Sequence, residues 1–381
     1  MLKVLAIYPA FDCNINEMAV VWARLCERGE SKCAVVTNIS DTLKANIAKS
    51  SRETLDNLEI HRFVAPLSSG KTLKQIVDIA SELRPDVIFC AVVHNLPIAR
   101  AVQRTFPVPI CLHTEYFLDT NYGLRRRAFL GLKWLRPIVH KWYRANILSQ
   151  CQAVLCSNPE EFIYLNPNKA NNKLWYLPWP IMNKHLIRSY EQRQSNQVVY
   201  IGSLSQGKAV TRLVDYLLAL LKEFPSFEVV IVGPKIDRTA YRAIATLKQK
   251  GKDQVKLLDR CSKEKALDLI ASSLFVISPG KCLGWGIIGD AWVTGTPVIT
   301  AGLHYDLADG GNCILAPDVR TFLCLFAKLK SDKCLWTKLS EGGLASAALH
   351  DVDLVATRLL ECLMEVLQKP QIEPQSLQIS K

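Results

Sequence analysis

Short apolar runs alternate with helix-length amphipathic segments along this chain, in two successive series. Helical stretches such as Glu17–Arg28 and Leu73–Leu83 separate the apolar runs of the first series. This alternation is typical of βα units and parallel sheets, so we predict an α/β fold with two parallel sheets. The predicted strands are Lys3–Tyr8, Cys33–Thr37, Leu58–Phe63, Asp86–Val92, Pro109–His113 and Ala153–Ser157, then Val198–Ile201, Phe227–Val232, Val255–Leu258, Leu274–Ser278, Pro297–Thr300 and Cys313–Leu315.

The length of the chain fits two domains, because 381 residues with 49% hydrophobic content can bury two cores of ordinary size. We predict a first domain over 1–182, a linker over 183–197 and a second domain over 198–345. A helix over 346–368 is expected to return to the first domain, before a disordered tail over 369–381. Parallel sheets bind ligands at the carboxyl ends of their strands, so the two domains are expected to face each other across a cleft.

Cysteine usage and hydropathy bear on the compartment. The 13 cysteines are scattered without a CxxC pair, and no His cluster has metal-ligand spacing. This pattern favours a reducing compartment over disulfides or a zinc site. No apolar run approaches the length needed to cross a bilayer. We therefore expect a cytoplasmic protein, either free or peripheral on the cytoplasmic face of a membrane.

The net charge of +12 indicates an anionic partner. The densest basic region is Leu124–Arg144, in which cationic residues alternate with aromatic ones, a combination that suits anionic lipid headgroups. The alternative is a core-packing helix with a solvated basic face. Nucleic acid is disfavoured because no recognised nucleic-acid module is present. The predicted membrane or acceptor patch consists of Arg125, Arg126, Arg127, Lys133, Trp134, Lys141 and Trp142.

A first candidate phosphate site is the stretch GSLSQGK, Gly202–Lys208, between an apolar run and an amphipathic helix. It fits the first seven positions of a P-loop, which would make the protein an NTPase. Ala209 stands where that motif needs a Ser or Thr hydroxyl for magnesium, and this disfavours the NTPase interpretation. A purely structural turn is the other alternative.

A second candidate site is Ser278–Thr300, SPGKCLGWGIIGDAWVTGTPVIT, where a glycine-rich loop opens a helix. Glycine lets the backbone approach a ligand closely, and the first turn of a helix offers N–H groups to phosphate oxygens. Asp290 lies one helical turn past Gly286, within reach of a ribose hydroxyl. The alternative is a turn before an ordinary core helix.

Taken in order, these segments give the chain a resemblance to a known family. YIGSLSQGKA resembles a strand followed by GRLxxxKG, EVVIVGP a strand ending in glycine, and VKLLDRCSKEKALDLI the stretch VKFLGxVsxeel. SPGKCLGWGIIGDAWVTGTPVI and DGGNCILAP resemble PSxxEGFGLVxLEAMAxGTPVV and DGxNGxLV. These are the motifs of the retaining glycosyltransferase family 4, which has the GT-B fold of two Rossmann-like domains. The first half resembles this family more loosely, through RPDVIFCAVVHN and PVPICLHTEYF.

The resemblance implies transfer of a sugar from a nucleotide-diphosphate donor to a glycan, lipid-linked or other hydroxyl acceptor, with retention of configuration. It implies no metal and no cofactor, because Lys208 and backbone N–H groups near Gly286 and Ile287 would stabilise the leaving diphosphate. His113 and Lys208 are the implied catalytic residues. The implied donor-binding residues are Gly202, Ser203, Lys208, Gly233, Pro234, Asp259, Arg260, Gly284, Trp285, Gly286, Ile287, Ile288 and Asp290.

Three departures from the family pattern fall in the donor site. Ser203 stands where the family has an arginine, Lys281–Leu283 lack the usual sugar-binding acid, and Asp290 replaces a glutamate. These departures motivate an alternative of another class, a degenerate GT-B domain that binds a sugar nucleotide or a protein without turnover.

Overall fold

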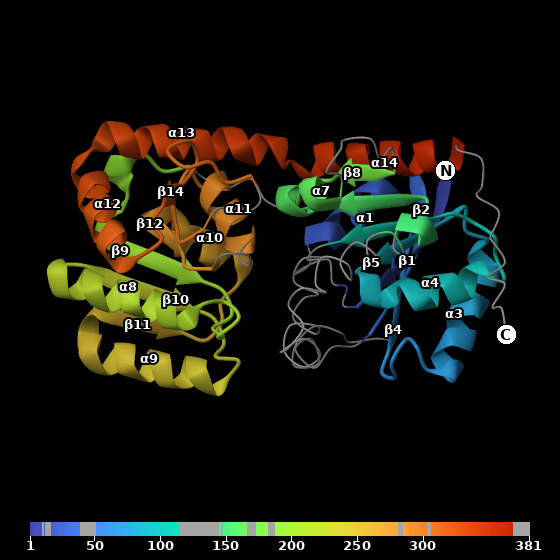
Figure 1. Cartoon of the computed structure of the whole chain (residues 1–381), viewed down its shortest axis with the longest axis horizontal. Coiled ribbons are helices and arrows are strands. Elements are labelled where there is room, and N and C mark those ends of the chain that lie inside the picture. Colours follow the sequence, from blue (N-terminus) through green and yellow to red (C-terminus); the bar gives the residue numbers. More distant parts are fainter. Residues whose placement is uncertain are drawn as a thin grey trace. The chain divides into compact units, whose positions relative to one another are not determined.

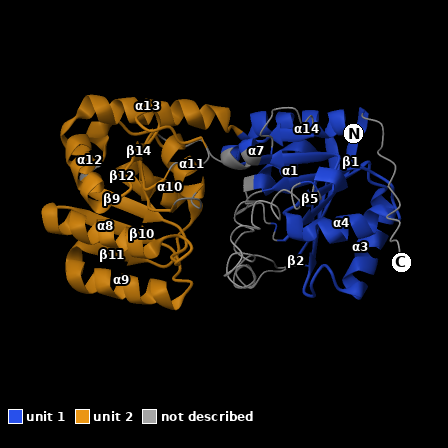
Figure 2. Cartoon of the chain, in the orientation of Figure 1, with its two compact units in different colours: residues 1–180, 352–381 blue, residues 181–351 orange. Residues whose placement is uncertain are grey.

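The computed structural model divides the chain into two compact units (Figures 1 and 2). Unit 1 comprises residues 1–180 and 352–381, and unit 2 comprises residues 181–351. The structure describes residues 1–9, 11, 17–38, 51–114, 145, 148–165, 173–181, 187–280, 285–302 and 306–368. The sequence placed the corresponding boundaries at 182 and 345, and the tail predicted to be disordered lies outside the described residues.

Unit 1 contains a sheet with the strand order β3-β4-β2-β1-β5-β6-β7-β8. Neighbouring strands pair in parallel, except that β3 runs antiparallel to β4. The six strands predicted for this half are confirmed, whereas β3 and β8 were not predicted. The strands are β1 (Leu2–Tyr8), β2 (Ser31–Asn38), β3 (Arg52–Leu55), β4 (Leu58–Phe63), β5 (Val87–Ala91), β6 (Ile110–Thr114), β7 (Ala153–Cys156) and β8 (Leu174–Tyr176).

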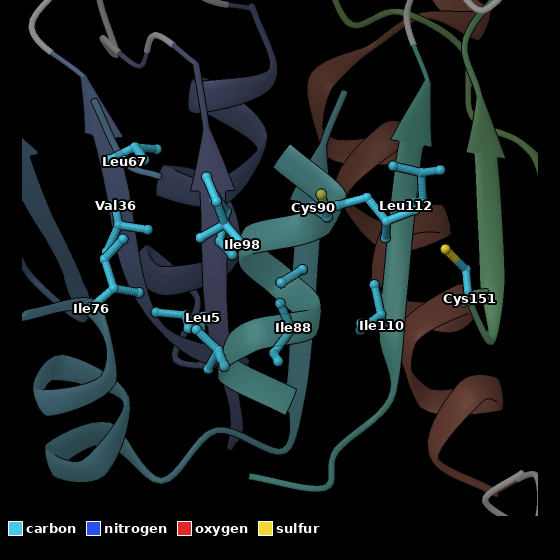
Figure 3. Close-up of a cluster of buried hydrophobic side chains, with 14 of the residues drawn as sticks. Leu5, Val36, Leu67, Ile76, Ile88, Cys90, Ile98, Ile110, Leu112 and Cys151 are labelled. Carbon is cyan, nitrogen blue, oxygen red and sulfur yellow. The ribbon is translucent and has the colours of Figure 1, made fainter. Parts of the chain in front are cut away.

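The central strands of this sheet are apolar because helices cover both of its faces. Every residue of β5, VIFCA, is buried, as expected for a strand in the middle of a parallel sheet. One face packs on α3 and α4, and their shared core includes Leu5, Ile88 and Ile98 (Figure 3). The helices of unit 1 are α1 (Glu17–Glu27), α3 (Gly70–Leu83), α4 (Leu96–Gln103), α7 (Pro159–Leu165) and α14 (Val352–Gln368), with a 3-10 turn over Val93–Asn95.

The last helix, α14, belongs to unit 1 although it follows unit 2 in the sequence. It packs against α1, and Asp353 forms ion pairs with Arg24 Nε at 2.9 Å and with Arg28 Nη2 at 2.7 Å. Its apolar face, which includes Val355, Leu359 and Leu363, is buried. The chain therefore crosses from one unit to the other twice, near residues 181 and 351.

Unit 2 contains a parallel sheet with the strand order β11-β10-β9-β12-β13-β14. From β9 the chain moves outward to β10 and β11, and it then returns to add β12, β13 and β14 on the other side of β9. The direction of winding thus reverses between β9 and β12. The strands are β9 (Gln194–Ile201), β10 (Glu228–Val232), β11 (Val255–Leu258), β12 (Ser273–Ser278), β13 (Val298–Thr300) and β14 (Ile314–Leu315).

Four helices of unit 2, α9, α10, α12 and α13, begin at side chains that cap their first turns. Ser262 Oγ accepts from Lys265 N, and the carboxylates of Asp237, Asp318 and Asp332 do the same for the helices that follow them. α8 packs with α9 and α12, while α11 packs with α10 and α13. The helices are α8 (Val210–Glu223), α9 (Arg238–Gly251), α10 (Lys263–Ser272), α11 (Trp285–Val293), α12 (Val319–Ser331) and α13 (Lys333–Leu349), with 3-10 turns over Tyr190–Gln192 and Lys252–Gln254.

A buried arginine joins the ends of two of these helices. Arg193, which is 6% exposed, donates to the carbonyls of Ile270 and Ala271 in the last turn of α10, at 3.4 and 2.8 Å. It also donates to the carbonyls of Thr294 and Gly295, just after α11, at 2.8 and 3.1 Å. Burial lowers the pKa of Arg193 to about 10, so the guanidinium stays charged at neutral pH.

Within the described residues, no helix is both long enough and apolar enough to cross a membrane.

Candidate functional site

The point where the unit 2 sheet reverses its winding lies between β9 and β12. Ligands of open parallel sheets bind outside the carboxyl ends of the strands at such a point. The segment after β9 is Gly202–Ala209, and the segment after β12 begins at Pro279. Both sequence-predicted phosphate segments therefore start at the expected place in the fold.

The Gly202–Ala209 segment is held by backbone hydrogen bonds to the segment that follows β10. Gly202 N donates to Val232 O at 2.9 Å, Leu204 N to Pro234 O at 2.9 Å, and Ile236 N to Leu204 O at 2.9 Å. Gly202, with φ of 151°, and Gly233, with φ of 144°, lie where these two segments touch. The structure thus brings together four predicted donor-site residues, Gly202, Ser203, Gly233 and Pro234.

Asp237 fixes the next part of this segment, a role that the sequence analysis missed. Its Oδ2 accepts from Gln206 N at 2.8 Å, and its Oδ1 accepts from Ala240 N at 2.8 Å as the cap of α9. These backbone hydrogen bonds, led by that from Gln206, lower the pKa of the Asp237 carboxyl. An Asp that precedes a helix is a recognisable capping signal, but its second bond reaches 31 residues back along the chain.

Lys208 lies at the end of the segment and is half-buried. Its backbone N–H donates to Ser205 O at 3.1 Å and lies 3.2 Å from Ser205 Oγ, which closes a turn before α8. Ala209 follows in the left-handed conformation, with φ of 56° and ψ of 38°. This is the position of the second glycine in GRLxxxKG, and the conformation explains why glycine suits it.

Replacing Ala209 with glycine is expected to stabilise unit 2 by about 0.5–1 kcal/mol, because the alanine Cβ is strained in the left-handed region. Urea unfolding of the two proteins measures the difference. Ala240→Gly, in the first turn of α9, is the matched control and is expected to destabilise by about 1 kcal/mol. Equal losses in both variants would show that Ala209 is not strained.

The helix α11 contributes mostly backbone to the candidate site. Trp285, Ile287 and Ile288 are all buried, and the Trp285 ring lies 4.5 Å from the ring of His350. Since these side chains pack in the core of unit 2, they position the helix, and the backbone of its first turn is the part available for a phosphate. Gly286 is half-buried, and Gly284 lies outside the described residues.

Asp290 on α11 has a partner that the sequence analysis missed. Lys263, the first residue of α10, places its Nζ 2.6 Å from Asp290 Oδ1 and 2.8 Å from Oδ2. Asp290 is more buried than Lys263, with exposed side-chain fractions of 13% and 39%. A ribose that used Asp290 would therefore share the carboxylate with Lys263 or displace it.

The predicted base-binding residues Asp259 and Arg260 follow β11 and are exposed. Asp259 forms an ion pair with Lys235, whose Nζ lies 3.3 Å from Asp259 Oδ1. Gly233 N donates to Leu258 O at 2.9 Å, so the end of β11 adjoins the Gly233 turn. Asp259 and Arg260 therefore lie at the carboxyl ends of the strands, as does the Gly202–Ala209 segment.

His113, the predicted catalytic residue of the first half, is on β6 in unit 1 and is fully buried. Its Nε2 lies 2.7 Å from Ser157 Oγ, and its ring stacks on Trp179 with centroids 5.7 Å apart. Among the described residues, Nδ1 has no hydrogen-bond partner. Burial lowers the pKa of His113 to about 4, so the imidazole is neutral at pH 7 and is unsuited to act there as a general acid.

The buried imidazole predicts a pH dependence of stability. The unfolded chain takes up a proton near pH 6.5, whereas the folded chain does so only near pH 4, so acidification between these values favours unfolding. We expect the free energy of unfolding to fall by about 3 kcal/mol more in the natural protein than in His113→Phe across this window. Urea titrations at several pH values measure it. His94→Phe, which removes an exposed histidine, is the control variant. An unchanged slope in His113→Phe would contradict the prediction.

The remaining predicted groups are not placed by the structure. The patch that contains Arg125, Arg126, Arg127, Lys133, Trp134, Lys141 and Trp142 lies outside the described residues, as do Lys281–Leu283. In the part of the chain that is described, no group of three or more His, Cys, Asp or Glu side chains could hold a metal ion. The described cysteines are free thiols, mostly buried, with Cys324 and Cys334 exposed.

Comparison with solved structures identifies the architecture. Sucrose-phosphate synthase from Thermosynechococcus elongatus matches with a TM-score of 0.74 and 16% identity, over 97% of this chain and 100% of that one. The chain has the GT-B fold. Anabaena HepE in complex with UDP matches with a TM-score of 0.70 and 14% identity, over 96% and 100% of the two chains.

The GT-B fold is shared by enzymes of more than one class. A putative UDP-N-acetylglucosamine 2-epimerase from Listeria monocytogenes matches with a TM-score of 0.61 and 11% identity, over 99% of this chain and 100% of that one. No protein-family model and no curated protein sequence matches the chain. The comparisons thus establish the fold, and the activity has to be inferred from the site.

Proposed function

We propose that this protein is a glycosyltransferase that moves a sugar from a nucleoside-diphosphate donor to a hydroxyl of a glycan, lipid-linked or other acceptor, with retention of configuration. The observation that carries the proposal is the position of two segments. Gly202–Ala209 and the segment that begins at Pro279 follow the adjacent strands β9 and β12, where the sheet reverses its winding. The HepE structures with UDP and with UDP-glucose are consistent with such a donor.

In this proposal the protein stabilises the departing diphosphate without a metal ion. Negative charge develops on the terminal phosphate as the glycosidic bond breaks. The backbone N–H groups of the first turn of α11 are held by the helix before the reaction, and together with the Lys208 ammonium they would stabilise this charge with little reorganisation. Asp290 would accept hydrogen bonds from the ribose, and groups near Asp259 and Arg260 would contact the base.

A panel of UDP-, GDP- and ADP-sugars tests the proposal. Release of the free nucleoside diphosphate, or transfer to added acceptors, is expected with one donor and should persist in EDTA. Lys208→Ala should reduce turnover at least 100-fold, by loss of a charge-assisted contact made in the transition state. Lys222→Ala, on the exposed last turn of α8, is the matched control and should retain activity. The anomeric configuration of the product, read by NMR, tests retention.

A second candidate function is binding of a sugar nucleotide without turnover. Two observations favour it: Ser203 stands in the place of the family arginine, and Lys263 already pairs with the Asp290 carboxylate. Saturable binding of a donor with no hydrolysis and no transfer to any acceptor would support this candidate over the enzyme. Conversion of a UDP-sugar to its epimer would point to an epimerase, and magnesium-dependent hydrolysis of ATP or GTP to an NTPase.

We also propose that the protein binds anionic membranes on the cytoplasmic side through its Leu124–Arg144 region. Seven Lys and Arg residues stand in this stretch beside Trp and Tyr, a composition suited to lipid headgroups. Flotation with vesicles that contain phosphatidylserine should recover the protein, and salt should reduce the recovery. Reversing the charges of Arg125, Arg126 and Arg127 should abolish it, and binding that survives this change would exclude this patch.

A further inference from the structure

Arg212 links the two segments of the candidate site. It lies on the first turn of α8, four residues after Lys208, and its side chain is half-buried. Its Nη1 donates to the carbonyl of Pro279 at 3.4 Å. Pro279 is the first residue after β12, whereas α8 follows from β9, so the guanidinium reaches from one strand connection to the other. The Arg212 guanidinium therefore lies at the carboxyl ends of the strands, at the point where the winding reverses.

Among the described residues, no carboxylate forms an ion pair with Arg212. Two other cations at the carboxyl ends of these strands do have acidic partners: Lys235 pairs with Asp259, and Lys263 pairs with Asp290. The carbonyl of Pro279 is a neutral acceptor at a long distance, and a guanidinium carries five N–H donors. Because the half-buried Arg212 guanidinium has unused N–H donors and a full positive charge, a bound anion would stabilise it.

We propose that Arg212 is the second cation of the donor site and binds the terminal phosphate of the nucleoside diphosphate together with Lys208. This inference rests on the proposed function. The family places its second cation directly after the first glycine of the β9 segment, where this chain has Ser203. Arg212 supplies that charge from α8. Its planar fork can give two parallel N–H bonds to a phosphate, which suits Arg better than Lys for this role.

The proposal predicts selective loss of affinity for diphosphates. Arg212→Gln should weaken UDP binding on the order of tenfold or more, because a charge-assisted contact to the terminal phosphate is lost. UMP lacks that phosphate, so its affinity should change little. Arg212→Lys should be intermediate. A merely structural role of Arg212, through its bond to Pro279, would instead weaken UDP and UMP alike.

Calorimetric titration of the full chain with UDP and UMP tests the proposal, or the matching GDP or ADP pair if the donor panel selects another base. The set comprises the natural protein, Arg212→Gln, Lys208→Ala and the control Lys222→Ala, each checked for folding by circular dichroism. In a fourth variant, Ser203→Arg is added to Arg212→Gln. Restoring a guanidinium at the family position should recover UDP affinity, and this recovery would exclude misfolding as the cause of the loss.

Three outcomes would overturn the proposal. If Arg212→Gln binds UDP as tightly as the natural protein while Lys208→Ala does not, the proposed function stands and Arg212 has no part in it. If Arg212→Gln loses UDP and UMP equally, and Ser203→Arg restores neither, Arg212 is structural. A natural protein that binds none of the nucleotides would overturn both the proposed function and this inference.

Discussion

Replacing Arg193 with methionine is expected to lower the free energy of unfolding by about 3–5 kcal/mol, which corresponds to a fall in Tm of roughly 10 °C. Arg193 is buried, and its donors serve the carbonyls at the ends of α10 and α11 and the hydroxyl of Thr296, at 2.7 Å. Methionine fills a similar volume but donates no hydrogen bond. The carbonyls of Ala271 and Thr294 would then lose the donor that reaches them, whereas those of Ile270 and Gly295 keep hydrogen bonds from Thr296 Oγ1 and Ser340 Oγ. The C-terminal ends of both helices would also lose a cation that their dipoles favour.

Thermal and urea unfolding followed by circular dichroism measure this effect. Arg188→Met is the matched control, because Arg188 is more exposed and its carbonyl, which accepts from Arg193 Nη2 at 2.9 Å, is kept. We expect the control to lose less than about 1 kcal/mol. Arg193→Lys should also be strongly destabilised, since an ammonium cannot reach the two helix ends together. A loss in Arg193→Met no larger than that in Arg188→Met would refute this role.

The second large effect is expected from Gly233→Ala. An alanine Cβ at this position would lie 2.0 Å from the carbonyl oxygen of Gly202 and 2.7 Å from its carbonyl carbon. Both atoms are backbone, so a side-chain rotation cannot relieve the clash, and φ of 144° is itself strained for alanine. The variant is expected to lose about 3 kcal/mol or more in stability. It should also lose nucleotide binding, because the Gly202–Ala209 segment must move away from β10.

Gly310→Ala is the control that separates the effect of the backbone clash from the effect of the strained φ angle. Gly310 has φ of 70°, and an added Cβ would meet no atom within 4 Å, so this variant carries backbone strain without a clash. It should lose about 1 kcal/mol and retain nucleotide affinity. If Gly233→Ala matches it in both stability and binding, the close contact between the β9 and β10 segments does not shape the site.

The placement of the cations bears on whether the protein turns over a donor or only binds it. The GRLxxxKG pattern that the chain resembles has two positive charges in one loop, and this chain has only Lys208 there. The structure adds Arg212 at the Pro279 carbonyl and Lys263 at Asp290. If Arg212 binds the phosphate as proposed, the missing arginine does not by itself imply an inactive protein. Lys263 remains a competitor for any ribose that uses Asp290.

The sequence by itself determined the two sheets and where in the chain the candidate site segments lie. Strands such as β5 are short apolar runs between helices. A continuous apolar run of this length indicates a strand that is buried on both faces. The glycine-rich segments after β9 and β12 could be found because a strand followed by glycines and a helix is a local pattern. β3, RETL, was missed because it is an antiparallel edge strand with mostly exposed, polar residues.

Only the tertiary structure decided which side chains meet at the site. Asp237 with Gln206, Lys263 with Asp290, and Arg212 with Pro279 are pairs whose members lie 31, 27 and 67 residues apart. Nothing in the local pattern around either member specifies its partner, because the pairs form only when parallel strands align their carboxyl ends. The local sequence pattern determines which residues are buried in a sheet, whereas the order of the strands determines which charged side chains meet at their carboxyl ends.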